Sequence, residues 1–371
     1  MKSSTPYRFL FAGGGTGGHL YPAIAVADEI KRLKPESEII FVGTKSKIEG
    51  RVIPKLGYGF KSIWIKGFAR KFNLENLLFP VKLLVSLVQS LFISFRFKPK
   101  VAIGSGGYVA GPAIWGASVL GAKVILMESN SYPGVTTRLL ERYADEVNIS
   151  FEDSKKYLRK PDKIKLTGNP VRAELGSSTK EEAKKYFGLE ADKTTVLVLG
   201  GSLGAASINE TFASCVEELE KKSLQIIWQT GKNYYHSYKN INLHSVKILD
   251  FIEDMNKAYS ACDLLVARAG ATTIAELTVL GIPSILIPSP HVAENHQYYN
   301  AKSLADNNAA VLIKDSDVKS LLKDKILEVV ADKKLLNSLS ENSKKISKPE
   351  AANVIAKSAI NFALATWQMN N

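Results

Sequence analysis

The chain is poor in cysteine, and no part of its beginning resembles a secretory signal. Only Cys215 and Cys262 are present among 371 residues, far apart and each within an apolar pattern. We therefore expect buried, inert thiols and neither a disulfide framework nor a cysteine-based metal site. The short apolar run near Phe9 reads as a first strand without a small-residue cleavage site, so we expect a protein that stays in the cytoplasm.

Acidic pairs that suit a metal ion are also scarce. The pair Asp315-Ser316-Asp317 follows a predicted strand, away from the motifs described below, and reads as a helix cap. We therefore predict that the protein needs no metal ion and no cofactor.

Positive charge exceeds negative charge in the first half of the chain only. The formal net charge is +13. Residues 1–171 hold 26 Lys and Arg against 13 Asp and Glu, and residues 172–371 hold 23 against 23. A basic domain favours an anionic partner, which means nucleic acid, an acidic lipid surface or a phosphorylated substrate. The solvated surface of a basic protein is the alternative that charge leaves open.

Alternating strand and helix patterns predict an α/β protein with a doubly wound parallel sheet in each half. After the first strand, strands of the first half are predicted at 38–44, 61–66, 100–105, 123–129, 146–150 and 163–168. The second half repeats the pattern with TTVLVLG, LQIIWQT, VKILDFI, LLVAR, PSILIPS and AAVLI. An Asn-Pro turn and a polar stretch near residue 177 mark the linker. We predict domains at 1–171 and 172–347, with a C-terminal helix at 348–371 packed back on the first domain.

Residues 77–100 form the most apolar segment of the chain. Pro80 and Lys82 interrupt it and leave less than the roughly 20 residues of a transmembrane helix. Its apolar residues keep helical spacing, so a buried crossover helix explains most of the segment. Basic residues beside aromatic ones such as Trp64 and Phe68 also suit an interfacial patch on an anionic leaflet. A partly membrane-facing helix and a purely structural one both remain open.

A glycine-rich turn follows the first strand of each half. Residues 13–18 fit the pattern GxGxxG, but a nicotinamide enzyme needs an acidic residue where the second strand ends at Thr44. A P-loop needs Lys and Ser or Thr where this chain has His19 and Leu20. The sequence therefore supports neither hydride transfer nor nucleotide hydrolysis. It supports a phosphate or anion site at a helix N-terminus.

Three further segments follow the same plan. IGSGGYVAGP gives the basic half a second loop, so two loops there can grip one diphosphate, and GGSLG at 200–204 can serve a second ligand. VARAGATTIAEL at 266–277 places Thr272 and Thr273 in the first turn of a helix, where N–H groups and hydroxyls can meet a leaving diphosphate. Glu276 can hold a ribose diol, although a helix dipole also favours a Glu near a helix start.

Seven segments in register resemble the MurG family, the bacterial UDP-N-acetylglucosamine:undecaprenyl-diphosphate-muramoyl-pentapeptide N-acetylglucosaminyltransferases. They are GGGTGGHLYPAIAVA at 13–27, GSGGYVAGP at 104–112, GNPVR at 168–172, GGSLGA at 200–205, FIEDM at 251–255, RAGATTIAEL at 268–277 and NHQYYNA at 295–301. The resemblance implies a GT-B fold, in which two Rossmann-like domains face each other across a cleft. The first domain would receive the lipid acceptor and the second the UDP-sugar.

The resemblance also assigns site residues. Contacts to UDP-GlcNAc fall on Thr16, Gly17, Gly18, Asn130, Arg172, Ser202, Ile252, Ala271, Thr272, Thr273, Ile274, Ala275, Glu276 and Gln297. The acceptor diphosphate falls on loops that contain Gly14, Gly15, Gly106, Gly107 and Tyr108. In these roles the backbone of Ile252 faces the uracil, Glu276 holds the ribose, and Asn130 and Gln297 bind sugar hydroxyls. Arg172 is left between phosphate and uracil.

The chain departs from the family pattern at a few positions. Leu203 and Ser129 stand where many relatives have Gln, and Ala69 precedes the arginine of the hydrophobic acceptor loop. Polar contacts of the first two positions, and the role of the loop, do not carry over from the resemblance.

The implied reaction is one inverting displacement, in which the 4-hydroxyl of the MurNAc unit of lipid I attacks the anomeric carbon of GlcNAc and UDP leaves. Helix N–H groups, hydroxyls and an arginine can stabilise the leaving diphosphate without a metal. His19 is the candidate general base, and the alternative is that it only positions the loop and the acceptor.

The expected partners are UDP-GlcNAc, lipid I and the anionic leaflet at the cytoplasmic face of the inner membrane, where the protein would be peripheral, and no nucleic acid. Three rival functions remain open from the sequence. They are a GT-B transferase acting on diacylglycerol, a UDP-GlcNAc epimerase, and a nucleotide-sugar-binding scaffold at the membrane.

Overall fold

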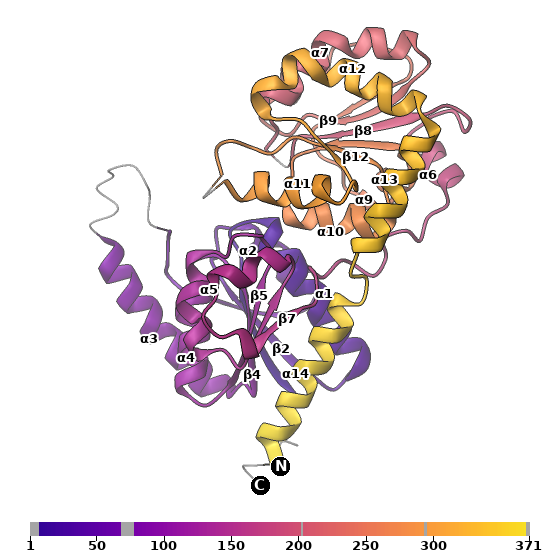
Figure 1. The fold of residues 1–371 in the computed structure, drawn as a ribbon. Coiled ribbons are helices and arrows are strands. Elements are labelled where there is room, and N and C mark those ends of the chain that lie inside the picture. The colour runs from indigo at the N-terminus through magenta and orange to yellow at the C-terminus, as the bar shows by residue number, and fades with distance from the viewer. Residues whose placement is uncertain (1–6, 68–77, 202, 293–294, 369–371) are drawn as a thin grey trace. The chain divides into compact units, whose positions relative to one another are not determined.

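The computed structural model describes residues 7–67, 78–201, 203–292 and 295–368, which form two compact units (Figure 1). The first unit combines Met1–Arg172 with Lys348–Asn371, and the second is Ala173–Ser347. Arg172 belongs to the first unit, whereas the sequence division places it at the start of the second domain.

The first unit is built on a seven-stranded parallel sheet within the described residues. Its strands are β1 (Arg8–Gly13), β2 (Glu38–Gly43), β3 (Gly59–Ser62), β4 (Val101–Gly106), β5 (Lys123–Glu128), β6 (Glu146–Ile149) and β7 (Ile164–Leu166), in the order β3-β2-β1-β4-β5-β6-β7. The central strands are apolar on both faces because helices cover both faces. The strand predicted at 61–66 is wrong in its bounds, since β3 pairs with β2 only as far as Ser62.

Helices cover both faces of this sheet (Figure 1). They are α1 (Gly17–Leu33), α2 (Ile48–Lys55), α3 (Phe79–Phe97), α4 (Ala110–Val119), α5 (Val135–Leu140) and α14 (Ala351–Gln368). One core cluster joins the sheet to α1, α2 and α14, and it includes Phe11, Ile30, Ile53 and Ile355. A second cluster joins the other face to α4 and to the partly buried side of α3. The last helix of the chain therefore completes the core of the first unit.

The helix α3 presents its apolar side outward. Its buried residues are serines at four-residue spacing, Ser86, Ser90 and Ser94. Small side chains let α3 approach α4 closely, and a Cβ at Gly116 of α4 would lie 3.0 Å from the carbonyl carbon of Ser90. The exposed set Val81, Leu84, Val88, Phe92 and Phe95 is called the apolar face of α3 below. The interpretation of the apolar spacing as a buried crossover helix is therefore wrong.

The second unit has a six-stranded parallel sheet in its described part. Its strands are β8 (Thr195–Leu199), β9 (Gln225–Gln229), β10 (Val246–Leu249), β11 (Leu264–Ala267), β12 (Ser284–Leu286) and β13 (Val311–Leu312), in the order β10-β9-β8-β11-β12-β13. Its helices are α6 (Lys180–Tyr186), α7 (Ala206–Lys221), α8 (Tyr235–Tyr238), α9 (Met255–Ala261), α10 (Ala271–Leu280), α11 (His296–Asp306), α12 (Val318–Ala331) and α13 (Lys333–Ile346). In Figure 1, α7 and α12 cover one face of the sheet, and α9 and α10 the other. Trp228 of β9 is fully buried against Phe212 of α7.

Candidate active site

In the first unit, the two glycine loops of the basic half meet where the strand order reverses. β1 pairs with β4, and the pairing register shifts between Ala12 and Gly13. A Cβ at Gly13 would lie 1.8 Å from the hydroxyl oxygen of Ser105, and one at Gly107 would lie 2.6 Å from the carbonyl oxygen of Gly14. Ligands of open α/β sheets bind at the carboxyl ends of strands at such a reversal. The structure therefore brings the loops at 13–18 and 104–107 into direct contact at a typical binding position.

His19 lies between these loops. Its Nδ1 is 3.3 Å from the carbonyl oxygen of Gly14 and 3.4 Å from the hydroxyl oxygen of Thr16. Gly106 has φ +105°, and a Cβ there would lie 2.9 Å from Nε2 of His19. Because a carbonyl oxygen can only accept, this geometry assigns the proton of a neutral imidazole to Nδ1. Nε2 is then the nitrogen able to take a proton.

A buried carboxylate that the sequence analysis does not use holds the first loop. Glu49, in the first turn of α2, is 1% exposed. Its Oε2 accepts the N–H of Gly15 and its Oε1 accepts the N–H of Thr44, each at 2.9 Å. The N–H of Gly15 is thus engaged within the protein, which narrows the predicted diphosphate contacts of this loop to its other groups.

The remaining predicted residues of the first unit follow β5 or flank α1. The carboxylate of Glu128 accepts hydrogen bonds from the backbone N–H and the side-chain amide of Asn130, at 3.0 and 3.4 Å. The guanidinium of Arg172 lies 5.5 Å from the ring centroid of Tyr21 in α1. Tyr108 is half exposed. Each of these side chains is held by its own unit.

In the second unit, the loops after β8 and β11 also meet at a reversal of strand order. Ala267 of β11 pairs with Leu199 of β8. A side-chain amide missed by the sequence analysis links the first of these loops to the loop after β10. Gln229 donates from Nε2 to the carbonyl of Gly201 and accepts the N–H of Ile252, at 3.1 and 2.9 Å. A backbone contact of Ile252 with a uracil therefore falls to its carbonyl. Ser202 lies outside the described residues.

Arg268 and Asp315 form an ion pair in this unit, with 2.5 Å between Nη1 and Oδ1. Ser207, in the first turn of α7, contacts both partners, at 3.0 Å from Nη2 and 2.6 Å from Oδ1. Asp315 therefore lies beside the glycine-rich motifs, and the prediction that its segment lies away from them is wrong. Asp317 stands at the N-cap of α12 but its side chain makes no capping hydrogen bond.

The helix α10 begins at Ala271 and displays the predicted donor segment. Thr272, Thr273 and Ala275 are half-buried, whereas Ala271, Ile274 and Glu276 are buried. The hydroxyl of Tyr259 donates to Oε2 of Glu276 at 2.9 Å. Oε1 of Gln297, in α11, accepts the N–H of Ser289 at 2.9 Å. Thr272 and Thr273 occupy the first turn, where the helix dipole is positive.

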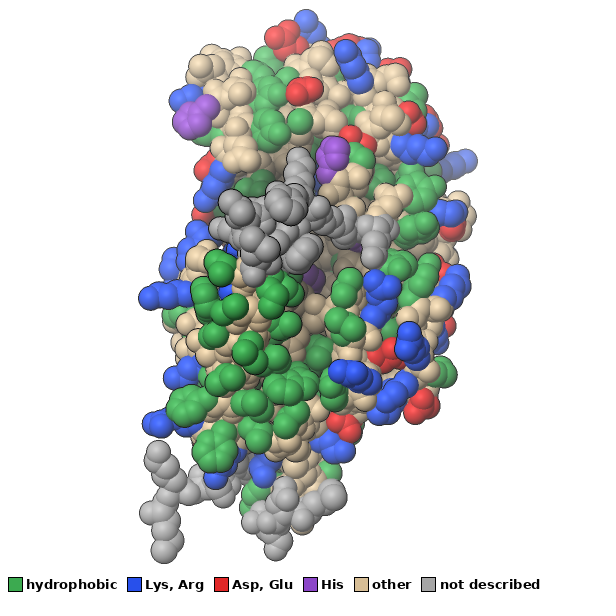
Figure 2. Space-filling view, turned by 90° about the vertical axis from the view of Figure 1, so that its left-hand side faces the viewer, with side chains coloured by type: hydrophobic (Ala, Val, Ile, Leu, Met, Phe, Trp, Pro, Cys, Tyr) green, Lys and Arg blue, Asp and Glu red, His purple; other side chains and the backbone are tan. Residues whose placement is uncertain are grey.

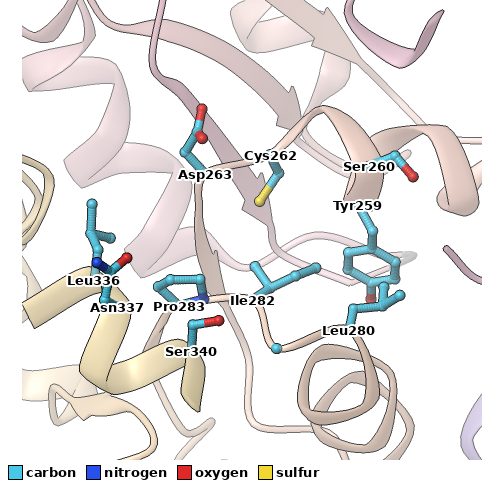
Figure 3. Close-up of a pocket in the computed structure, with 11 residues that line it drawn as sticks. Tyr259, Ser260, Cys262, Asp263, Leu280, Ile282, Pro283, Leu336, Asn337 and Ser340 are labelled. Atoms are coloured by element: carbon cyan, nitrogen blue, oxygen red, sulfur yellow. The ribbon is translucent and has the colours of Figure 1, made fainter. Parts of the chain in front are cut away.

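A cavity of about 380 Å³ lies elsewhere in this unit (Figure 3). Cys262 and Asp263, which precede β11, line it together with Leu280, Pro283 and Ser340. Burial raises the pKa of the Cys262 thiol far above its ordinary value. Because the glycine-rich motifs follow the carboxyl ends of β8 and β11, this cavity is distinct from the predicted donor site.

Apolar side chains gather on the outer surface of the first unit (Figure 2). Besides the apolar face of α3, Trp64 is half exposed, and Nζ of Lys82 lies 5.7 Å from its ring centroid. Within the described residues, α3 alone meets the length and hydropathy of a membrane-crossing helix. The prediction that its apolar run is too short is wrong because Pro80 stands in the first turn, where proline does not break a helix. Phe68, Ala69 and the rest of the predicted acceptor loop lie outside the described residues.

Among the residues that the structure describes, no three His, Cys, Asp or Glu side chains gather in a group able to hold a metal ion.

Comparison with known proteins identifies the family. Sequence models of the glycosyltransferase family 28 N-terminal and C-terminal domains match residues 9–149 and 195–355. The chain is 43% identical over 357 residues to the UDP-N-acetylglucosamine–N-acetylmuramyl-(pentapeptide) pyrophosphoryl-undecaprenol N-acetylglucosamine transferase of Flavobacterium psychrophilum, covering 95% of this chain and 97% of that one. The protein of the same description from Cytophaga hutchinsonii is 41% identical over 353 residues, 95% of each chain.

Solved structures agree. The crystal structure of Acinetobacter baumannii MurG has a TM-score of 0.75 and 26% identity, over 96% of this chain and all of that one. The predicted GT-B fold, with its two Rossmann-like domains, is thereby confirmed, as is the resemblance drawn from the seven motifs. The chain belongs to glycosyltransferase family 28 and, within it, to the MurG family of N-acetylglucosamine transferases.

Proposed function

We propose that this chain transfers GlcNAc from UDP-GlcNAc to the 4-hydroxyl of the MurNAc unit of lipid I by a single inverting displacement, with His19 as the general base. The supporting observation is the position of His19 at the reversal of strand order, where Gly14 engages Nδ1 and leaves Nε2 to accept the proton of the attacking hydroxyl. The loops that contain Gly106, Gly107 and Tyr108 bind the acceptor diphosphate beside it.

The second unit binds the donor in this proposal. The first turn of α10, with Thr272 and Thr273, stabilises the charge that develops on the leaving diphosphate. Glu276 accepts hydrogen bonds from the ribose hydroxyls, and its carboxylate is already oriented by Tyr259. Arg268 is committed to Asp315, so its part in the reaction is to hold the loop that leads into α10.

The apolar face of α3 places the protein at the anionic cytoplasmic leaflet. The helix is packed on α4 along its serine stripe, so contact with lipid occurs through the opposite face and not by crossing the bilayer. Arg96 and Lys98 at the end of the helix are exposed and suit anionic headgroups.

The deciding experiment supplies the purified protein with labelled UDP-GlcNAc and either lipid I or diacylglycerol, with and without a chelator. We expect labelled lipid II from the first acceptor at an unchanged rate in chelator. A glycolipid from diacylglycerol, free ManNAc with UDP, or binding without product would instead identify a different transferase, an epimerase or a scaffold. The His19→Ala variant should lose at least about 100-fold in kcat with little change in KM for UDP-GlcNAc. Equal losses in both would make His19 a binding residue.

A further inference from the structure

The carboxylate of Glu49 occupies a slot that two glycines make for it. A Cβ at Gly14 would lie 2.4 Å from the carboxyl carbon of Glu49, and one at Gly43 would lie 2.5 Å from its Cγ. Any other residue at either position would collide with this side chain. The slot therefore serves Glu49 specifically, at the point where the turns after β1 and β2 lie closest.

Both oxygens of this carboxylate accept backbone N–H groups, one from each turn. Oε2 accepts from Gly15 and Oε1 from Thr44, each at 2.9 Å, and the side chain is excluded from water. Hydrogen bonds to an ionised acceptor are stronger than neutral ones. Glu49 thus ties the glycine loop to the neighbouring strand.

One peptide group connects Glu49 to His19. The N–H of Gly15 and the carbonyl of Gly14 belong to the same planar trans peptide, so they point in opposite directions. Glu49 engages the N–H end, and Nδ1 of His19 lies 3.3 Å from the carbonyl end. Two adjacent glycines allow this peptide to rotate easily, and Gly15 already has φ +84°. Fixing the N–H therefore fixes the direction of the carbonyl.

We propose that Glu49 is a positioning residue for glycosyl transfer. By holding the Gly14–Gly15 peptide, it keeps the Gly14 carbonyl on Nδ1–H of His19, and this selects the tautomer whose Nε2 accepts the proton of the attacking hydroxyl. The proposal rests on the proposed role of His19 as base. Glu49 touches neither donor nor acceptor in this role.

Glu49→Gln is the direct test. Its single amide oxygen can accept from Gly15 or from Thr44 but not from both, because the amide NH₂ meets the second N–H as a like donor. We expect kcat to fall about 10- to 100-fold while KM for UDP-GlcNAc changes less than about 3-fold. Glu49→Asp keeps the charge and should recover part of the lost kcat.

Glu141→Gln is the matched control. Glu141 is also a buried carboxylate of the first unit, and its Oε1 accepts the backbone N–H groups of Arg159 and Lys160, at 2.5 and 2.7 Å, in a different part of the unit. We expect Glu141→Gln to lower the melting temperature and leave kcat within about 2-fold of wild type, because its partners lie outside the glycine loops. An equal loss of kcat in both variants would reduce Glu49 to a stabilising residue and overturn the proposal.

A double-mutant cycle and a spectroscopic measurement separate this proposal from the role of His19. In the His19→Ala background, Glu49→Gln should lower kcat less than about 2-fold further, and an additive loss would overturn the proposal. ¹⁵N NMR of the imidazoles, assigned with His19→Gln, should show Nδ1 protonated in the wild type and a mixture of tautomers in Glu49→Gln. An unchanged tautomer in the folded variant would contradict the proposal. If His19→Ala retains full kcat, the proposed base fails, while the tautomer shift still reports whether Glu49 positions the ring.

Discussion

The hydroxyl of Tyr259, in α9, donates a 2.9 Å hydrogen bond to Oε2 of Glu276, in α10, and both side chains are buried. This contact fixes the orientation of the carboxylate that we propose for the ribose. Tyr259→Phe removes the donor and keeps the ring, so we expect KM for UDP-GlcNAc to rise about 3- to 10-fold with kcat nearly unchanged. Steady-state kinetics and calorimetric titration with UDP measure this. Tyr186→Phe, at an exposed tyrosine of the same unit, is the control. Unaltered UDP affinity in Tyr259→Phe would argue against the ribose role.

Asp315 is the partner of Arg268, and its loss leaves a partly buried guanidinium without its carboxylate. We expect Asp315→Ala to lower the free energy of unfolding of the second unit by about 2–3 kcal/mol. Denaturant unfolding checks this value. Asp324→Ala, whose carboxylate is 78% exposed and 3.9 Å from Lys323, should change stability by less than about 0.5 kcal/mol. Similar effects of both substitutions would show that the Arg268 pair adds nothing beyond an exposed one.

The apolar face of α3 can be changed without touching the core, because Phe92 and Phe95 are 64% and 66% exposed. We expect the Phe92→Ser, Phe95→Ser double variant to bind vesicles with anionic lipid at least about 10-fold more weakly than wild type, since burial of a Phe contributes about 1.5–3 kcal/mol. Vesicle sedimentation measures binding, and the melting temperature should stay within a few degrees. Ser90→Leu, on the buried stripe, should instead lower the melting temperature. Undiminished vesicle binding by the double variant would refute membrane contact through this face.

Acid should loosen α14 through Glu29. Hydrogen bonding to Arg32 holds the pKa of the Glu29 carboxyl below its ordinary value of 4.5, and Oε1 also accepts from Asn353 of α14 at 3.0 Å. A carboxyl with a lowered folded pKa contributes stability above pH 4.5 and loses it as the pH falls through the folded pKa. Hydrogen exchange of the amides at 351–368 should therefore accelerate relative to the rest of the unit below that range.

Glu29→Gln is the check on this assignment. The variant should exchange faster than wild type in α14 at pH 7, and the difference should disappear under acid conditions that protonate Glu29. A difference of equal size at both pH values would mean that the carboxylate charge is irrelevant to α14.

Much of the fold follows from local pattern. Apolar β-branched runs separated by helical segments predict parallel sheets, and glycines after such strands predict turns at the carboxyl ends. The contact between the loops at Gly13 and Gly106 is a consequence, because their strands are neighbours at the reversal of strand order. These relationships need only the rules of chain connection, so one sequence suffices for them.

The features that the sequence analysis missed depend on contacts between distant residues. Arg268 and Asp315 are 47 residues apart, and nothing in either segment marks the other as its partner. Glu49 resembles any acidic residue in a first helical turn, although the glycines at 14 and 43 are the sign that a side chain needs their space. The direction of α3 was missed because hydropathy spacing identifies an apolar side without stating what covers it. The three serines on the other side were the available signal for close helix packing.

The position of α14 has a consequence for biosynthesis. Ile355, Ala359 and Ala363 are fully buried in the core that β1 and β4 share, yet the second unit is translated between those strands and this helix. While the ribosome makes residues 173–347, the nascent first unit keeps an uncovered apolar groove beside α1. The second unit is contiguous and can fold as soon as it emerges, since domains generally fold as units during synthesis. The acceptor half of this enzyme, although translated first, is therefore the half that matures last.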